Sequence, residues 1–157
     1  MSSDVGSIYL RYGPMVFRRC LAILRQREEA HDATQDVFVK YLADPGRARV
    51  LYPSAYLYRC ATNHSLNLLK RRSFASAEGD LAERIATSED FDDAVAARTV
   101  LDALFRREPA STRLIAYLRY VDDMDLKEIA LVAGLSVSGV RRRLARLKEK
   151  ARGLQEA

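Results

Sequence analysis

The sequence lacks most of the residue patterns that mark catalytic, metal-binding and membrane proteins. Its two cysteines, Cys20 and Cys60, form no CxxC pair and have no histidine at metal-ligand spacing, so we expect reduced, packed thiols. No apolar run approaches the roughly 18 residues that a membrane span needs, and nothing at the N-terminus resembles a signal peptide. Without a glycine-rich phosphate loop or a Ser/His/Asp arrangement, we expect no enzyme, cofactor or small-molecule substrate. A cytoplasmic protein with no membrane insertion is the expectation.

The charge of the chain is unevenly distributed along its 157 residues. Residues 1–72 carry 12 Lys/Arg against 6 Asp/Glu (+6), residues 73–108 carry 4 against 9 (−5), and residues 109–157 carry 10 against 6 (+4). Two basic lobes thus flank an acidic middle. A polyanion contacted at two places would explain this pattern, because clustered Lys and Arg release counterions from phosphate backbones. Charge that serves only solubility would produce the same distribution.

The spacing of apolar residues predicts an all-α protein. Apolar residues recur at three and four positions, and sustained period-2 alternation is absent. Residues 73–93 are rich in Ser, Ala, Gly, Glu and Asp, a composition typical of a flexible acidic linker. The sequence therefore predicts two small helical domains, 1–72 and 94–157, joined by that linker. The expected helices span residues 14–26, 30–42, 53–72, 94–107, 110–121, 125–133 and 137–152.

The last two expected helices form a helix-turn-helix. Asp125 and Glu128 occupy the N-cap and N3 positions of a capping box, which predicts where the first of them begins. Gly134 follows its last residue, where a left-handed conformation is favoured, and Ser136 can cap the next helix. A turn this short between two helices is typical of a helix-turn-helix.

The final helix has an apolar inner face and a basic outer face. Its inward residues follow helical spacing and are Val137, Val140, Leu144, Leu147 and Ala151. Ser138, Arg142 and Arg146 then point outward, with Arg141 and Arg143 on the flanks. Arginine can bind guanine through two hydrogen bonds in the major groove, and the flanking pair can contact phosphates. A solvated basic helix is the alternative interpretation of this face.

The helix expected at residues 53–72 carries a polar stripe opposite its apolar face. Its members share one side of the helix and are Tyr56, Arg59, Asn63, Asn67 and Lys70, with Arg71 extending the basic end. An aromatic can stack on an unpaired base, amides can bind its edge, and cations can hold phosphates, so the stripe suits opened DNA. An ordinary solvent-exposed face would look similar.

The helix expected at residues 30–42 carries a different outward stripe, formed by Asp32, Gln35, Asp36 and Val39. Two acids on an otherwise basic lobe do not favour contact with DNA. We interpret this stripe as a protein-binding surface, with a solvated face as the equal alternative.

These segments resemble the extracytoplasmic-function sigma factors over nearly the whole chain. The resemblance is carried by Ala30-His31-Asp32-Ala33-Thr34-Gln35-Asp36-Val37-Phe38, by Ala55-Tyr56-Leu57-Tyr58-Arg59 with Asn63, Asn67 and Lys70-Arg71-Arg72, and by the run from Leu118 to Arg146. It implies that residues 1–72 bind the core RNA polymerase at the β′ clamp helices and recognise the minus-10 element. It assigns Asp32, Gln35, Asp36 and Phe38 to core binding, with Phe38 as a packing residue. It also implies that residues 94–157 recognise the minus-35 element and dock on the β flap.

The resemblance further implies promoter DNA and an anti-sigma factor as partners, and a base-binding role for the loop around residues 44–54. The sequence departs from the family at three motif positions, where Tyr56, Asn67 and Gly139 replace the usual Trp, Asp and Thr. Glycine at the last position weakens the recognition helix by up to about 1 kcal/mol. His31 and His64 are unusual in their motifs, and we interpret both as surface or packing residues.

Two other functions remain open at this point. A stand-alone helix-turn-helix regulator would leave the stripe on the helix at 30–42 unexplained. A sigma mimic that titrates an anti-sigma factor would not need the outward Arg142 and Arg146.

Overall fold

The computed structural model describes residues 2–75 and 95–156 of the chain. The chain divides into two compact units, Met1–Glu89 and Asp90–Ala157. All described elements are helical, so the expected all-α fold with two small domains is confirmed. Nearly all of the predicted linker, from residue 76 to residue 93, lies outside the described residues.

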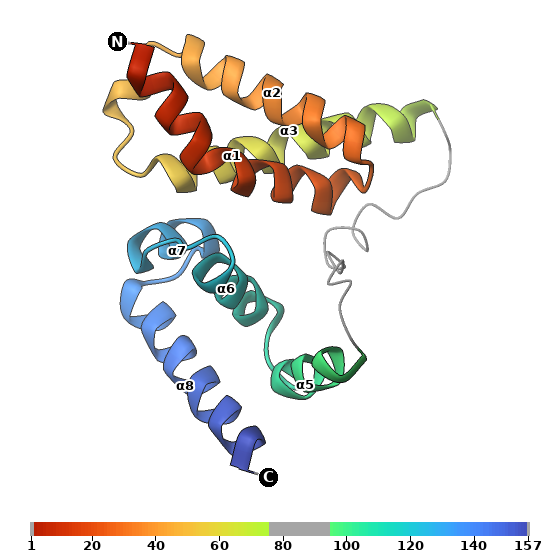
Figure 1. Ribbon diagram of the computed structural model, residues 1–157, viewed down its shortest axis with the longest axis vertical. Helices are drawn as coiled ribbons and strands as arrows, with labels where there is room; N and C mark the ends of the chain where they lie inside the picture. The colour runs from red at the N-terminus through yellow and green to blue at the C-terminus, as the bar shows by residue number, and fades with distance from the viewer. Residues whose placement is uncertain (1, 76–94, 157) are drawn as a thin grey trace. The chain divides into compact units, whose positions relative to one another are not determined.

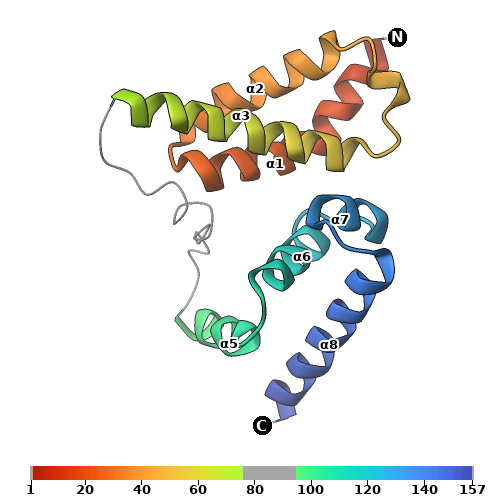
Figure 2. The same ribbon diagram turned by 180° about the vertical axis from the view of Figure 1, so that it is seen from behind.

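The described residues of the first unit form three long helices and a short 3-10 turn. These are α1 (Ser2–Leu24), α2 (Arg27–Ala43), η1 (Arg47–Arg49) and α3 (Pro53–Ala75). Each of the three long helices packs against the other two (Figures 1 and 2). Their shared core contains Val16 and Cys20 from α1, Val37 from α2, and Leu57 and Ala61 from α3, all of them buried.

The beginning of the first helix was predicted incorrectly. The spacing of apolar residues places the first helix at residues 14–26. The structure instead begins α1 at Ser2 and keeps Pro14 inside it. A proline inside a helix removes one backbone hydrogen bond. Tertiary packing outweighs this loss, since the ring centroids of Tyr9 and of Phe38 in α2 lie 4.9 Å apart. Gly13 precedes the proline, and its missing Cβ relieves the clash that a helical residue before proline otherwise meets.

The second unit contains four described helices: α5 (Val95–Phe105), α6 (Ala110–Tyr120), α7 (Leu126–Ala133) and α8 (Val137–Glu156). Helix α8 contacts α5, α6 and α7, and it ends four residues beyond the predicted position. Ile115, Leu118, Met124, Ile129 and Val140 are almost fully buried between these helices. This small core fixes which face of α8 points outward.

Candidate functional site

The helix-turn-helix forms as the local signals predict. The Asp125 side chain accepts from the backbone N–H of Glu128, and the Glu128 side chain accepts from that of Asp125, each at 2.9 Å. Gly134 ends α7 with φ at 68°, a left-handed conformation that glycine adopts without strain. The Ser136 hydroxyl then accepts from the backbone N–H of Gly139 at 3.0 Å and caps α8. These caps fix the angle at which α8 leaves the turn.

The outer face of α8 presents the predicted side chains. Ser138, Arg141, Arg142 and Arg146 are exposed, while Val140, Leu144 and Leu147 are buried beneath them. The guanidinium of Arg146 also faces the carboxylate of Glu108, which is only 7% exposed, across 3.6 Å. Lys150 lies 3.5 Å from the same carboxylate. The basic face of α8 is therefore partly neutralised at its far end.

Arg143 differs from the other arginines of α8. Its side chain is half-buried, and Nη1 donates to the hydroxyl of Ser111 in α6. The sequence predicts a phosphate contact for Arg143 because helical spacing alone places it on a flank. The structure shows that this guanidinium also fastens α8 to α6.

Gly139 has little room for a side chain. A Cβ built there would lie 3.1 Å from the hydroxyl oxygen of Ser136. Glycine, which replaces the family's usual threonine here, therefore leaves space for the Ser136 hydroxyl that caps α8.

The predicted polar stripe lies on α3. Arg59, Asn63, Asn67, Lys70 and Arg71 are all exposed, so the five side chains share the accessible side of the helix. At the end of this stretch, Arg72 forms an ion pair with Glu29 of α2. A row of two amides and three cations can hold a single nucleic-acid strand through its phosphates and base edges.

Tyr56, the sixth member of the stripe, is half-buried at the start of α3. Its hydroxyl donates to Oδ2 of Asp44 at 3.2 Å, and its ring lies 5.8 Å from that of Tyr41. Burial, together with the neighbouring Cys60 and Asp44, raises the pKa of Tyr56 to about 12. The phenol therefore remains a hydrogen-bond donor at neutral pH.

The loop between α2 and α3 is held by side chains of its own. Oδ1 of Asp44 accepts from the backbone N–H of Gly46 at 2.8 Å, and Arg47 donates to the carbonyl oxygen of Leu42 at 2.9 Å. Leu51, near the end of this loop, is 84% exposed. An ordered loop beside the polar stripe can receive a base that leaves the stack.

The acidic stripe on α2 is accessible as predicted. Asp32, Gln35, Asp36 and Val39 are exposed. Phe38, which the resemblance placed with them, is only 3% exposed and packs against Tyr9. Phe38 therefore lies in the core below the stripe, in agreement with the packing role expected for it.

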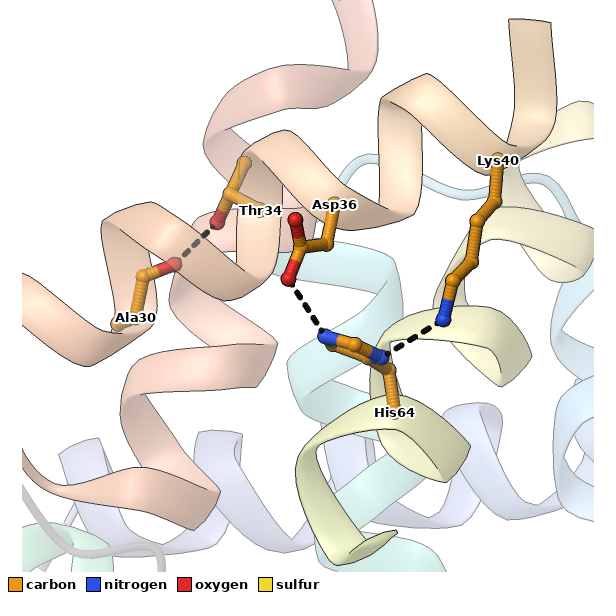
Figure 3. A network of polar contacts seen from close by, with 5 residues as sticks. All are labelled: Ala30, Thr34, Asp36, Lys40 and His64. Atoms are coloured by element: carbon orange, nitrogen blue, oxygen red, sulfur yellow. Dashed lines mark hydrogen bonds and ion pairs between the residues drawn. The ribbon is translucent and has the colours of Figure 1, made fainter. Parts of the chain in front are cut away.

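His64 of α3 contacts two residues of α2, a contact that the sequence did not predict. Its Nε2 lies 3.2 Å from Oδ2 of Asp36, and its Nδ1 lies 3.3 Å from Nζ of Lys40. Figure 3 shows the imidazole ring between these two side chains, one helical turn apart on α2. No local signal reveals this contact, because it joins residues 24 and 28 positions apart.

Within the described residues, the two thiols have raised pKa values, and the potential metal ligands do not cluster. Burial raises the pKa of the Cys20 thiol and that of the Cys60 thiol, which disfavours reactive thiolates. Within residues 2–75 and 95–156, no three His, Cys, Asp or Glu side chains gather as a metal site would require. In the same part of the chain, none of the helices has the length and apolar character needed to cross a membrane.

Comparisons with known proteins agree with this geometry. Residues 8–75 match the family model of Sigma-70 region 2, and residues 109–150 match that of Sigma-70, region 4. No curated protein matches the chain. Among solved structures, the chain resembles the sigma factor RpoE of Bartonella quintana, crystallised in complex with the anti-sigma factor NepR. The TM-score is 0.53 at 14% identity, over 98% of each chain, which indicates a common fold.

The two family matches favour a sigma factor over a stand-alone regulator. A stand-alone regulator would use the helix-turn-helix but would have no need of a region 2, which covers residues 8–75. Both regions occur in one chain, and each falls within one helical unit. The chain therefore belongs to the sigma-70 family, and it is an alternative sigma factor of the extracytoplasmic-function type that binds RNA polymerase and promoter DNA to direct transcription initiation.

Proposed function

We propose that the two domains divide promoter recognition between them, with residues 1–72 acting at the minus-10 element and residues 94–157 at the minus-35 element. The exposed face of α8 carries this proposal, because Arg142 and Arg146 project from a helix whose opposite side is buried in a capped helix-turn-helix. Ser138 and Arg141 extend the same surface. Arg142 and Arg146 bind base edges in the major groove, and Arg141 holds phosphates. Arg143 acts mainly by fixing α8 against Ser111.

In the first domain, the stripe on α3 binds the melted minus-10 element. Arg59, Lys70 and Arg71 hold phosphates while Asn63 and Asn67 bind the edges of unpaired bases. The hydroxyl of Tyr56 donates to Asp44 and so holds the start of the loop that receives a flipped base. Each flipped base costs a few kcal/mol of unstacking, which binding in this loop offsets.

The acidic stripe on α2 binds the polymerase itself. Asp32, Gln35 and Asp36 dock on the β′ clamp helices through hydrogen bonds and ion pairs, and Val39 adds an apolar contact. Phe38 contributes only by packing against Tyr9. The second domain docks on the β flap.

The other assignments follow from this division of labour. The acidic segment 73–93 connects the two DNA-binding domains, and an anti-sigma factor controls their availability. The protein works in the cytoplasm, where bacterial RNA polymerase acts. It contributes binding energy rather than catalytic groups, so no cofactor takes part.

Run-off transcription with purified core polymerase tests the proposal, with promoter fragments recovered from the source genome. Asp32→Ala/Gln35→Ala should abolish initiation together with core binding. Arg142→Ala/Arg146→Ala should retain core binding but lose use of the minus-35 element. Lys148→Ala/Arg152→Ala removes the same charge from exposed positions of α8 and serves as the matched control. The assignment of surfaces is wrong if the control fails as the arginine pair does, or if the acidic pair still binds core normally.

A further inference from the structure

The hydrogen-bonding partners of His64 determine where its proton lies. The ammonium of Lys40 can only donate a hydrogen bond, so Nδ1 of His64, 3.3 Å away, must accept it. The carboxylate of Asp36 can only accept, so Nε2, 3.2 Å from Oδ2, must carry the proton. The two contacts therefore favour the tautomer that carries its proton on Nε2 and its lone pair on Nδ1.

The contact with Nε2 restrains a residue on the proposed polymerase-binding stripe. The side chain of Asp36 is 59% exposed, whereas that of His64 is only 15% exposed. An exposed aspartate normally samples several rotamers, and a partner that binds one of them must oppose that freedom. A hydrogen bond from a largely buried ring to one carboxylate oxygen holds the side chain in a single orientation while leaving it accessible.

We propose that His64 is a positioning residue for polymerase binding: through Nε2–H it holds Asp36 in the orientation that the core enzyme recognises. The Lys40 contact on the other nitrogen keeps the proton on Nε2 and so keeps the donor directed at Asp36. His64 itself does not touch the polymerase. This inference rests on the proposed function of the α2 stripe.

The two amide substitutions of His64 separate positioning from simple packing. The side-chain nitrogen of glutamine lies near the position of Nε2, whereas that of asparagine lies near Nδ1. His64→Gln therefore retains a donor for Asp36, and His64→Asn does not. We expect His64→Asn and His64→Ala to weaken the equilibrium affinity for core polymerase by about three- to tenfold, and His64→Gln to stay within about twofold of wild type.

The same measurements on the Asp36→Ala background complete a double-mutant cycle on the full-length chain. If His64 acts through Asp36, each His64 variant on that background should bind core polymerase with the same affinity as Asp36→Ala alone. Thermal unfolding of each variant, followed by circular dichroism, identifies any loss that comes from the fold.

Two results would overturn the inference alone: His64→Asn binding as tightly as wild type while Asp36→Ala is weakened, or His64→Asn weakening binding equally with and without Asp36. An Asp36→Ala variant with unchanged core affinity would instead remove the proposed function of the stripe, and the inference with it.

Discussion

Tyr56 and Asp44 join the start of α3 to the end of α2 through a hydrogen bond of 3.2 Å from phenol to carboxylate. Asp44 is the C-cap residue of α2, and its other oxygen holds the backbone N–H of Gly46. The family's usual tryptophan has no hydroxyl for this bond. The loop of this protein is therefore fastened by the side chain that departs from the family motif.

The first prediction concerns that bond. Tyr56→Phe should increase hydrogen exchange of the amides at residues 44–52 and lower the free energy of unfolding by about 1 kcal/mol, since one net hydrogen bond is lost. Exchange followed by mass spectrometry measures the first effect, and urea unfolding measures the second. Tyr120→Phe removes an exposed phenol from α6 and serves as the control. Unchanged exchange at residues 44–52 would show that the bond does not order the loop.

Alkaline pH should weaken the same region. Burial raises the pKa of Tyr56 from 10.0 to about 12, so the folded state binds this proton more tightly than the unfolded chain. Its contribution to stability is present below pH 10 and is lost as the pH rises towards 12. The free energy of unfolding should fall over this range, and Tyr56→Phe should reduce the slope. Equal slopes for the two proteins would contradict the prediction.

The two thiols should differ in reactivity. Cys20 is completely buried and Cys60 is half-buried, and burial raises the pKa of both. Native protein treated with a disulfide reagent at pH 8 should therefore react slowly at Cys60 and not at Cys20. Both thiols should react at once in denaturant. Rapid labelling of Cys20 in the native state would mean that the core between α1, α2 and α3 opens easily.

Neighbouring arginines of α8 should have separable effects. Arg143→Ala removes the hydrogen bond to Ser111 and should lower the free energy of unfolding by about 1 kcal/mol. Arg142→Ala alters an exposed side chain and should change it by less than about 0.5 kcal/mol. Thermal unfolding of the two variants, with promoter affinity measured in parallel, checks both values. A stability loss shared by the two variants would argue against the distinct role of Arg143.

The two glycines of α1 should respond differently to alanine. A Cβ at Gly6 would meet no atom within 4 Å, so Gly6→Ala should gain about 0.5–1 kcal/mol from helix propensity. Gly13 precedes Pro14 inside the helix, and a proline disfavours the α conformation for a preceding residue that carries a Cβ. Gly13→Ala should therefore gain less. Chemical denaturation of both variants tests the difference, and equal gains would show that the proline imposes no such constraint.

The features that could be predicted from the sequence are those with local causes. Asp125, Glu128, Gly134 and Ser136 lie within twelve consecutive positions, and each carries its own capping preference, so the helix-turn-helix could be predicted in detail. The inward and outward faces of α2, α3 and α8 likewise follow from helical spacing alone.

The features that could not be predicted depend on how the helices pack. The spacing of apolar residues places the start of the first helix at residue 14, whereas α1 continues through Pro14 and packs Tyr9 against Phe38 of α2. His64 reaches Asp36 and Lys40 only after α2 and α3 are placed side by side. The hydrogen bond from Arg143 to Ser111 also depends on helix packing, because the two residues are 32 positions apart.

The crowding between Gly139 and Ser136 bears on any attempt to retarget this protein to a foreign promoter. Transplanting a recognition sequence with a side chain at position 139 would push the new Cβ against the hydroxyl that caps α8, 3.1 Å away. The helix would keep its new base-reading residues, but the Ser136 hydroxyl that caps it would have to shift by a few tenths of an ångström. A change of promoter preference that alters position 139 therefore also requires a change at position 136.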